Sequence, residues 1–278
     1  MNKIYEGIDK IRNNNKKRYF FNSLSFICVL YLIYLINLEN INFSKLLNYT
    51  TVFLFTSIAF FYLAFAGSWS ALIEKKFFNK RLIVLWLSSV IGKYIPTGLG
   101  VPLLRFEKLD KHEDNNSKII ILSTVKEVVY TLLSCIFISL LIFFEIYSGI
   151  TNFTLFSLIG ISFIYIIYNY LYKKNVNFFN FLITHIFLII FLCYLSYNQF
   201  QKIRIEFILV YILSSIISIL AIGVPAGLGI KELAFIQILS MIGSAEGAVE
   251  FITFARIYFV FFDLILFFII RFYRKVLS

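Results

Sequence analysis

Long apolar runs alternate with short polar connections along the whole chain. The apolar segments lie at about residues 19–37, 49–73, 82–95, 119–144, 150–172, 179–199, 207–224, 230–243 and 249–271. In a lipid bilayer the backbone must satisfy its own hydrogen bonds, so such segments are helices and an open sheet is excluded. The pattern therefore predicts an all-α polytopic integral membrane protein.

Two of these segments are too short to cross a bilayer and lie beside a proline. Residues 82–95 and 230–243 each hold 14 residues, roughly 21 Å of helix against a hydrocarbon core of about 30 Å. The neighbouring stretches IPTGLGVPLL and VPAGLGIKELAF share the pattern Pro-x-Gly-Leu-Gly followed by Val or Ile. A short apolar arm beside such a break predicts a re-entrant hairpin, which enters the membrane and returns on the same side.

The two motifs indicate an internal repeat. Pro225 lies 129 residues after Pro96, and a shift of 129 carries each apolar segment of the first half onto one of the second half. Each half then reads span, span, hairpin, span. Because three crossings is an odd number, the second half must be inverted, an architecture found in many transporters. The alternative is that Pro and Gly only kink ordinary helices and let them pack closely.

The predicted organisation is one membrane domain with about six full spans plus two re-entrant broken-helix hairpins. Its parts are a basic tail at 1–18, a first repeat at 19–146, a second and inverted repeat at 147–272, and a tail at 273–278.

Composition and charge agree with a membrane protein, because 60% of the residues are hydrophobic and 15% are charged. The net charge of +11 comes from Lys and Arg clusters between apolar runs, which are typical of cytoplasmic loops rather than of a nucleic-acid surface. With both breaks counted as hairpins, most of the 26 Lys and Arg fall on the side of the two termini. Both termini are therefore predicted to be cytoplasmic.

Cysteine and histidine suggest no special chemistry. Cys28, Cys135 and Cys193 are far apart and form no CxxC pair, so we predict no disulfide framework, no metal site and no cofactor. His185 is interpreted as a hydrogen-bonded residue of helix packing rather than a ligand or proton relay.

Cations gather at the two breaks. A helix that restarts after Pro-x-Gly-Leu-Gly presents backbone N–H groups and the positive end of its dipole, and glycine lets a phosphate approach closely. Lys231 begins the second such helix, Lys93 precedes Pro96 by three residues, and Arg105 lies at the exit of the first hairpin. A snorkelling interfacial position is an equal alternative for Arg105. Within membrane segments, lysines usually face a cavity or a partner.

Four further ionisable residues lie in apolar surroundings: Glu127, Glu232, Arg256 and Asp263. Asp263 follows Arg256 by seven residues, which places both on one face of a helix. Glu127 and Arg256 each lie 31 residues after the proline of their own half. We therefore hypothesise a central pair between them, direct or through a ligand. The alternative is that each has a separate neighbour, Glu127 with Lys126 or Lys231, and Arg256 with Asp263.

Three features together resemble the flippase-type transmembrane domain of the lysylphosphatidylglycerol synthase family. They are GKYIPTGLGVPLLRFEKL, the Lys-Glu pair near the start of the following span, and VPAGLGIKELAFIQIL followed by Arg256. The resemblance covers about residues 19 to 272. It implies a bacterial cell-membrane protein that moves a polar or modified phospholipid between leaflets, with Arg105, Glu127, Lys231, Glu232 and Arg256 as functional residues.

Two departures from the family pattern affect these expectations. Lys231 stands where the family more often has arginine, which weakens the case for bidentate phosphate binding. The sequence stops at Ser278, without the soluble aminoacyl-transferring domain. We therefore expect no synthesis of a lysyl-lipid by this chain.

The sequence predicts a translocase or binding protein for a phospholipid or polyprenyl-phosphate-linked lipid, without a catalytic site. The candidate substrate-binding residues are Lys93, Pro96, Gly98, Gly100, Arg105, Glu127, Pro225, Gly227, Gly229, Lys231, Glu232, Arg256 and Asp263. A membrane glycosyltransferase or its accessory subunit is one alternative, although the predicted outer loops are short and hold no paired acids. A small-solute secondary transporter is another, which the repeat alone does not exclude.

Overall fold

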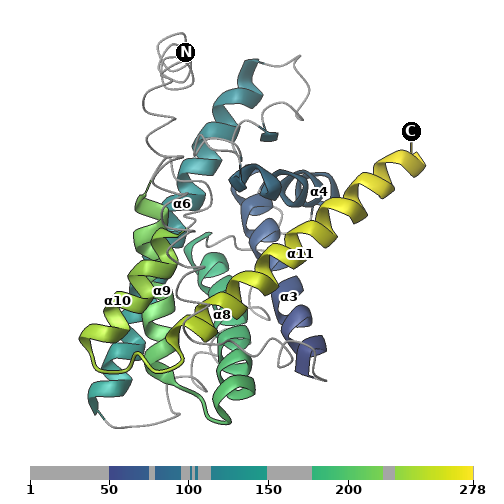
Figure 1. Cartoon of the computed structure of the whole chain (residues 1–278). Coiled ribbons are helices and arrows are strands. Elements are labelled where there is room, and N and C mark those ends of the chain that lie inside the picture. Colours follow the sequence, from purple (N-terminus) through teal and green to yellow (C-terminus); the bar gives the residue numbers. More distant parts are fainter. Residues whose placement is uncertain are drawn as a thin grey trace, which may run out of the picture.

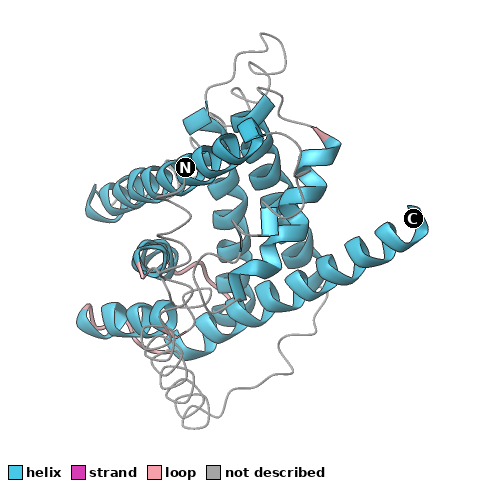
Figure 2. Ribbon diagram, turned by 90° about the horizontal axis from the view of Figure 1, so that it is seen from above, coloured by secondary structure: helices cyan, strands magenta, loops and turns pink. Residues whose placement is uncertain are grey.

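The computed structural model of the chain describes residues 50–74, 79–94, 101, 104–105, 114–148, 177–221 and 229–277. These residues form helices and short connections, with no strand among them (Figure 2). The all-α class is therefore confirmed. Several predicted features lie outside the described residues: the segments 19–37 and 150–172, and the break residues Pro96, Gly98, Gly100, Pro225 and Gly227.

Among the residues that the structure describes, four helices are long and apolar enough to cross a membrane. They are α3 (Thr50–Glu74), α6 (Asp114–Ser148), α8 (Asn177–Phe200) and α11 (Ala248–Leu277). The apolar parts that qualify are Thr51–Glu74, Ile119–Phe144, Phe178–Phe200 and Ala248–Ile270. Each agrees within a few residues with a span predicted from the sequence.

Shorter helices precede the first break and flank the second. Before the first break are α4 (Lys80–Ser89) and the 3-10 helix η2 (Val90–Tyr94). The second break separates α9 (Ile205–Leu220) from α10 (Ile230–Met241). At 10, 5, 16 and 12 residues, these helices fall short of the about 20 residues of a full span.

Two helices run past the apolar limits that the sequence indicates. α6 begins at Asp114, before the apolar segment 119–144, and α11 continues to Leu277, beyond the segment 249–271. Intrahelical hydrogen bonds do not require an apolar environment, so a helix continues beyond the hydrocarbon region. Hydropathy therefore marks the lipid-embedded part of a helix rather than its ends.

The centre of the fold is the contact between α3 and α8. Leu54 and Ile58 of α3 and Leu192 of α8 are fully buried there. Stacked rings join the same two helices at Phe60 and Phe187, with centroids 5.6 Å apart. Around this pair, α6 packs on α8 and α9, whereas α11 crosses the bundle diagonally and packs on α3 and α4 (Figure 1).

The helix contacts have a regular pattern. If α3 is exchanged with α8, α4 with α9 and α6 with α11, the pairs in contact among these six helices stay the same. For example, the contact of α6 with α9 becomes that of α11 with α4. The exchanged helices are also those that the 129-residue shift relates in sequence.

Candidate functional site

A cavity of about 250 Å³ lies between η2, the start of α10 and α11. Three basic side chains line it, Lys93 from η2, Lys231 from α10 and Arg256 from α11, together with the acid Glu232. Its apolar wall includes Phe61, Phe65, Leu188, Ile212, Ile219, Ile252 and Phe259. Four of the predicted substrate-binding residues are thus brought together around one space.

Asp263 of α11 binds side chains of η2, the 3-10 helix that precedes the first break. Its carboxylate accepts hydrogen bonds from the hydroxyls of Tyr62 (2.6 Å) and Tyr94 (2.5 Å). The ammonium of Lys93 lies 2.5 Å from Oδ2 of Asp263 and also donates to the Tyr62 hydroxyl at 3.1 Å. With only 1% of its side chain exposed, this carboxylate needs several donors to be tolerated in an apolar interior.

Gly229 begins α10 with a backbone angle φ of +81°, which a residue with a side chain rarely adopts. Its N–H donates to Oε2 of Glu232 at 2.8 Å. This is the acidic half of a capping box, in which the third helical residue reaches back to the cap. The prediction that the restarted helix leaves its N–H groups open to a phosphate is therefore wrong for this group, because the chain supplies its own carboxylate.

The second oxygen of Glu232 faces α11. Oε1 lies 3.5 Å from Nη1 of Arg256, which is longer than a normal hydrogen bond. The two side chains are 2% and 20% exposed, respectively. Glu232 thus joins the start of α10 to α11 through a loose ionic contact at the cavity wall.

Lys231 is in a different situation from the other basic residues of the cavity. Its ammonium lies 3.5 Å from the centroid of the Tyr211 ring, a close cation–π contact. Within the described part of the chain, no carboxylate forms an ion pair with it. Lys231 lines the cavity, in agreement with the expectation that a lysine within an apolar segment faces a cavity or a partner.

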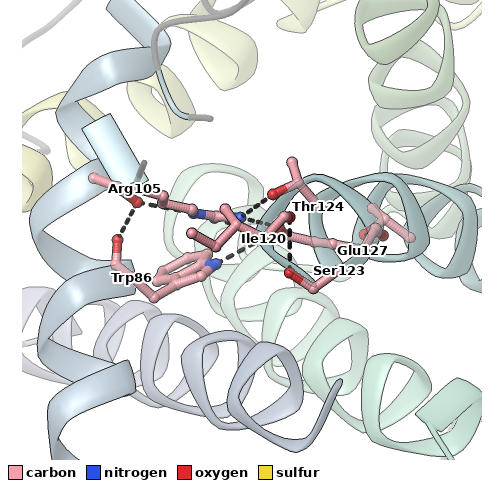
Figure 3. Close-up of polar contacts among 8 residues, drawn as sticks. Trp86, Arg105, Ile120, Ser123, Thr124 and Glu127 are labelled. Atoms are coloured by element: carbon pink, nitrogen blue, oxygen red, sulfur yellow. Dashed lines mark hydrogen bonds and ion pairs between the residues drawn. The ribbon is translucent and has the colours of Figure 1, made fainter. Parts of the chain in front are cut away.

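Arg105 lies away from the cavity and is almost completely buried, at 1% exposure. Both terminal nitrogens contact the carboxylate of Glu127, with Nη2 to Oε1 at 3.1 Å. Nε donates to Ser89 at 3.1 Å, and Trp86 donates its indole N–H to Glu127 at 2.8 Å (Figure 3). The guanidinium also lies 4.6 Å from the ring centroid of Trp69. The snorkelling alternative is therefore wrong, and these contacts make Arg105 a structural partner of α6.

The hypothesised direct pair between Glu127 and Arg256 is also wrong. Arg105 holds Glu127, and Glu232 contacts Arg256. In both halves the segment that follows the break supplies the opposite charge for the next long helix. This proximity in the chain favours a pair within each half over one across the centre. The partners proposed in the alternative, Lys126 or Lys231 for Glu127 and Asp263 for Arg256, are not the ones observed.

His185 is buried and hydrogen-bonded, as predicted, and it also lines the cavity. Nε2 lies 3.2 Å from Sγ of Cys135, and Nδ1 lies 2.8 Å from the carbonyl oxygen of Phe181. Among the residues that the structure describes, no group of three or more His, Cys, Asp or Glu side chains could hold a metal ion.

Sequence reasoning missed the aromatic hydrogen-bonding partners of the site. Tyr62, Tyr94 and Trp86 donate to the buried carboxylates, and Tyr211 supports Lys231. The chain holds 18 Tyr and 34 Phe, so a tyrosine in an apolar segment does not stand out. A usable signal is the spacing of Trp86, Ser89 and Lys93, which places polar groups on one face of the first arm.

Comparison of the chain with family models, curated proteins and solved structures finds no match.

Proposed function

We propose that the cavity binds the phosphate of a polar lipid and that the protein moves this lipid between the leaflets of a bacterial cell membrane. The observation that carries the proposal is a charge imbalance. The interior ion pairs Lys93–Asp263, Arg105–Glu127 and Arg256–Glu232 leave Lys231 without a carboxylate partner among the described residues.

An unbalanced cation at membrane depth is costly and usually marks a functional position. A phosphodiester carries one negative charge and can serve as the counter-ion of the Lys231 ammonium. Arg256 lines the same cavity and offers several N–H donors in a planar array, a geometry suited to phosphate oxygens. Both requirements favour a phosphate-bearing ligand over a neutral one.

The size and lining of the cavity favour a headgroup. Its volume of about 250 Å³ is below the roughly 300–1,000 Å³ of pockets that enclose a drug-sized molecule. A headgroup fits such a space, whereas the acyl chains of a lipid would remain outside in the bilayer. The largely apolar walls are compatible with chains passing close by.

The architecture supports transport rather than simple binding. The exchange pattern of the helix contacts is what an internal repeat produces, and broken helices that meet near the midplane form the substrate sites of many transporters. The motif resemblance to the lysylphosphatidylglycerol synthase transmembrane family indicates a lipid as the cargo. An exchange between two inverted halves would expose the cavity to each leaflet in turn.

The test is a lipid-movement assay in reconstituted vesicles. The protein should accelerate exchange of fluorescently labelled phosphatidylglycerol, measured by chemical quenching of the outer leaflet, and should not accelerate exchange of labelled glucosylceramide, which has no phosphate. Lys231→Gln should slow the exchange at least about tenfold. Lys126→Gln is the matched control, because Lys126 is an exposed lysine of α6 away from the cavity.

Three outcomes would refute the proposal: no acceleration over protein-free vesicles, equal acceleration of both lipids, or equal loss in both lysine variants. Uptake of glycerol 3-phosphate without lipid movement would instead support a small-solute transporter.

A further inference from the structure

The carboxylate of Glu232 lies in the position where an anionic ligand is expected. It binds the cap N–H of α10, is next in sequence to Lys231, and faces Arg256. The start of a helix and nearby basic groups together form an anion site. Glu232 therefore places a negative charge from the chain itself inside the proposed phosphate site.

The contacts of Glu232 are unequal in strength. Its Oε2 accepts the Gly229 N–H at 2.8 Å, whereas its Oε1 is 3.5 Å from Arg256. With its side chain 2% exposed, the carboxylate cannot follow a partner without breaking the helix cap. Arg256 has the longer side chain and greater exposure, so it is the member of the pair that can turn toward a ligand.

The related pair of the first half has the opposite character. Arg105 and Glu127 contact one another through two nitrogens and two oxygens and are held by additional hydrogen bonds (Figure 3). This pair lies outside the cavity lining. A closed pair away from the cavity fixes the structure, whereas a loose pair at the cavity wall is available for exchange with a ligand.

We propose that Glu232 is an intramolecular competitor of the substrate anion. In the empty site it balances Arg256; when a lipid phosphate enters, Arg256 turns from Glu232 to the phosphate, which also balances Lys231. As the phosphate leaves, Glu232 takes Arg256 back. A transported ligand must bind well enough to enter and weakly enough to leave, and the fixed carboxylate limits affinity in this way. The inference rests on the proposed function of the cavity.

The decisive variant is Glu232→Gln. Glutamine also serves at this position of a capping box, so its carbonyl can still accept the Gly229 N–H while the competing charge is removed. We expect the dissociation constant for labelled phosphatidylglycerol in detergent micelles to fall at least about fivefold. The maximal rate of lipid exchange in vesicles should fall as well, because release becomes slower.

Glycerol 3-phosphate serves as the second probe, so that binding of a free phosphate ester is separated from binding of a lipid. Tighter binding of either probe by Glu232→Gln supports the competitor role. Glu206→Gln is the control, because it removes one carboxylate from the first turn of α9, away from the cavity. Its affinities should equal those of the wild type.

Failure of the inference and failure of the proposed function give different results. If the wild type binds neither probe, the proposed function is wrong. If the wild type binds labelled phosphatidylglycerol and Glu232→Gln binds it equally or more weakly, the competitor role is wrong and the proposed function stands. If Glu232→Gln does not fold, Glu232→Asp decides in its place. The aspartate side chain is shorter by one methylene, so its carboxylate lies farther from Arg256. If Glu232→Asp does not bind the probes more tightly than the wild type does, the inference is overturned.

Discussion

We interpret the buried pair Arg105–Glu127 as a structural contact rather than as part of the substrate site. This interpretation can be tested quantitatively. Glu127→Gln removes the negative charge and leaves the guanidinium of Arg105 at 1% exposure without its counter-ion. The variant also replaces an acceptor oxygen with a donating amide group opposite further N–H donors. Loss of one member of a buried pair costs about 3–5 kcal/mol. The unfolding equilibrium constant should therefore rise by roughly two to three and a half powers of ten.

A second ion pair of the same chain is the control. Arg204 and Glu206 lie 2.8 Å apart, but their side chains are 14% and 34% exposed. Solvent screens such a pair, so Glu206→Gln should cost only about 0–1 kcal/mol. The difference between the two glutamate variants then reports the effect of burial on the same chemical change.

A double variant separates an unpaired charge from a lost contact. In Arg105→Met with Glu127→Leu both charges are absent, so the penalty for a buried unpaired cation disappears. The indole N–H of Trp86 loses its acceptor, which costs about 1–3 kcal/mol if the group stays buried without another, whereas the Ser89 hydroxyl still donates to the carbonyl oxygen of Trp86 at 2.7 Å. In a double-mutant cycle, the double variant should therefore lose less stability than the sum of the losses of the two single variants.

The measurement is reversible unfolding of the purified protein in mixed micelles, with the folded fraction followed at several denaturant concentrations. A cost below about 1 kcal/mol for Glu127→Gln, equal to that of Glu206→Gln, would show that the interior of the first half tolerates an unpaired arginine. The structural role of the pair would then be refuted.

Two further predictions concern the α10–α11 turn and the topology. Gly247→Ala should destabilise the fold more than Gly243→Ala: both glycines have positive φ, but a Cβ at 247 would lie 2.5 Å from the ring of Phe200, whereas one at 243 meets nothing within 4 Å. The strain shared by both variants is about 1–3 kcal/mol, and equal unfolding temperatures would contradict the steric argument. In a background without native cysteines, Lys76→Cys and Lys111→Cys should be labelled from the same side of the membrane; labelling from opposite sides would make the first hairpin a full span.

Much of the helical framework could be predicted from the sequence. In lipid, the backbone of an apolar run must satisfy its own hydrogen bonds, so the run forms a helix. The segments at 49–73 and 179–199 reappear as Thr50–Glu74 and Asn177–Phe200. The short segment at 230–243 appears as Ile230–Met241. The inverted orientation of the halves and the side of the termini stay predictions.

The residues of the site were easier to predict than their partners. A charge within an apolar run is visible in a sequence, and Lys93, Lys231, Glu232 and Arg256 do line one cavity. Which acid meets which base depends on helix rotation and on side-chain reach, which hydropathy does not report. Glu127 was for this reason assigned to the wrong cation, and the role of Glu232 as a helix cap was not anticipated.

The cluster at Asp263 has a consequence for synthesis of the protein. Tyr62 and Tyr94 bind a carboxylate that lies 201 and 169 residues later in the chain. At roughly 5–20 residues per second, the ribosome needs on the order of 10–30 s to make the segment between Tyr94 and Asp263. During this time Lys93 is without the acid that balances it in the finished protein. A chain interrupted before α11 therefore lacks the carboxylate that Lys93, Tyr62 and Tyr94 contact in the complete fold.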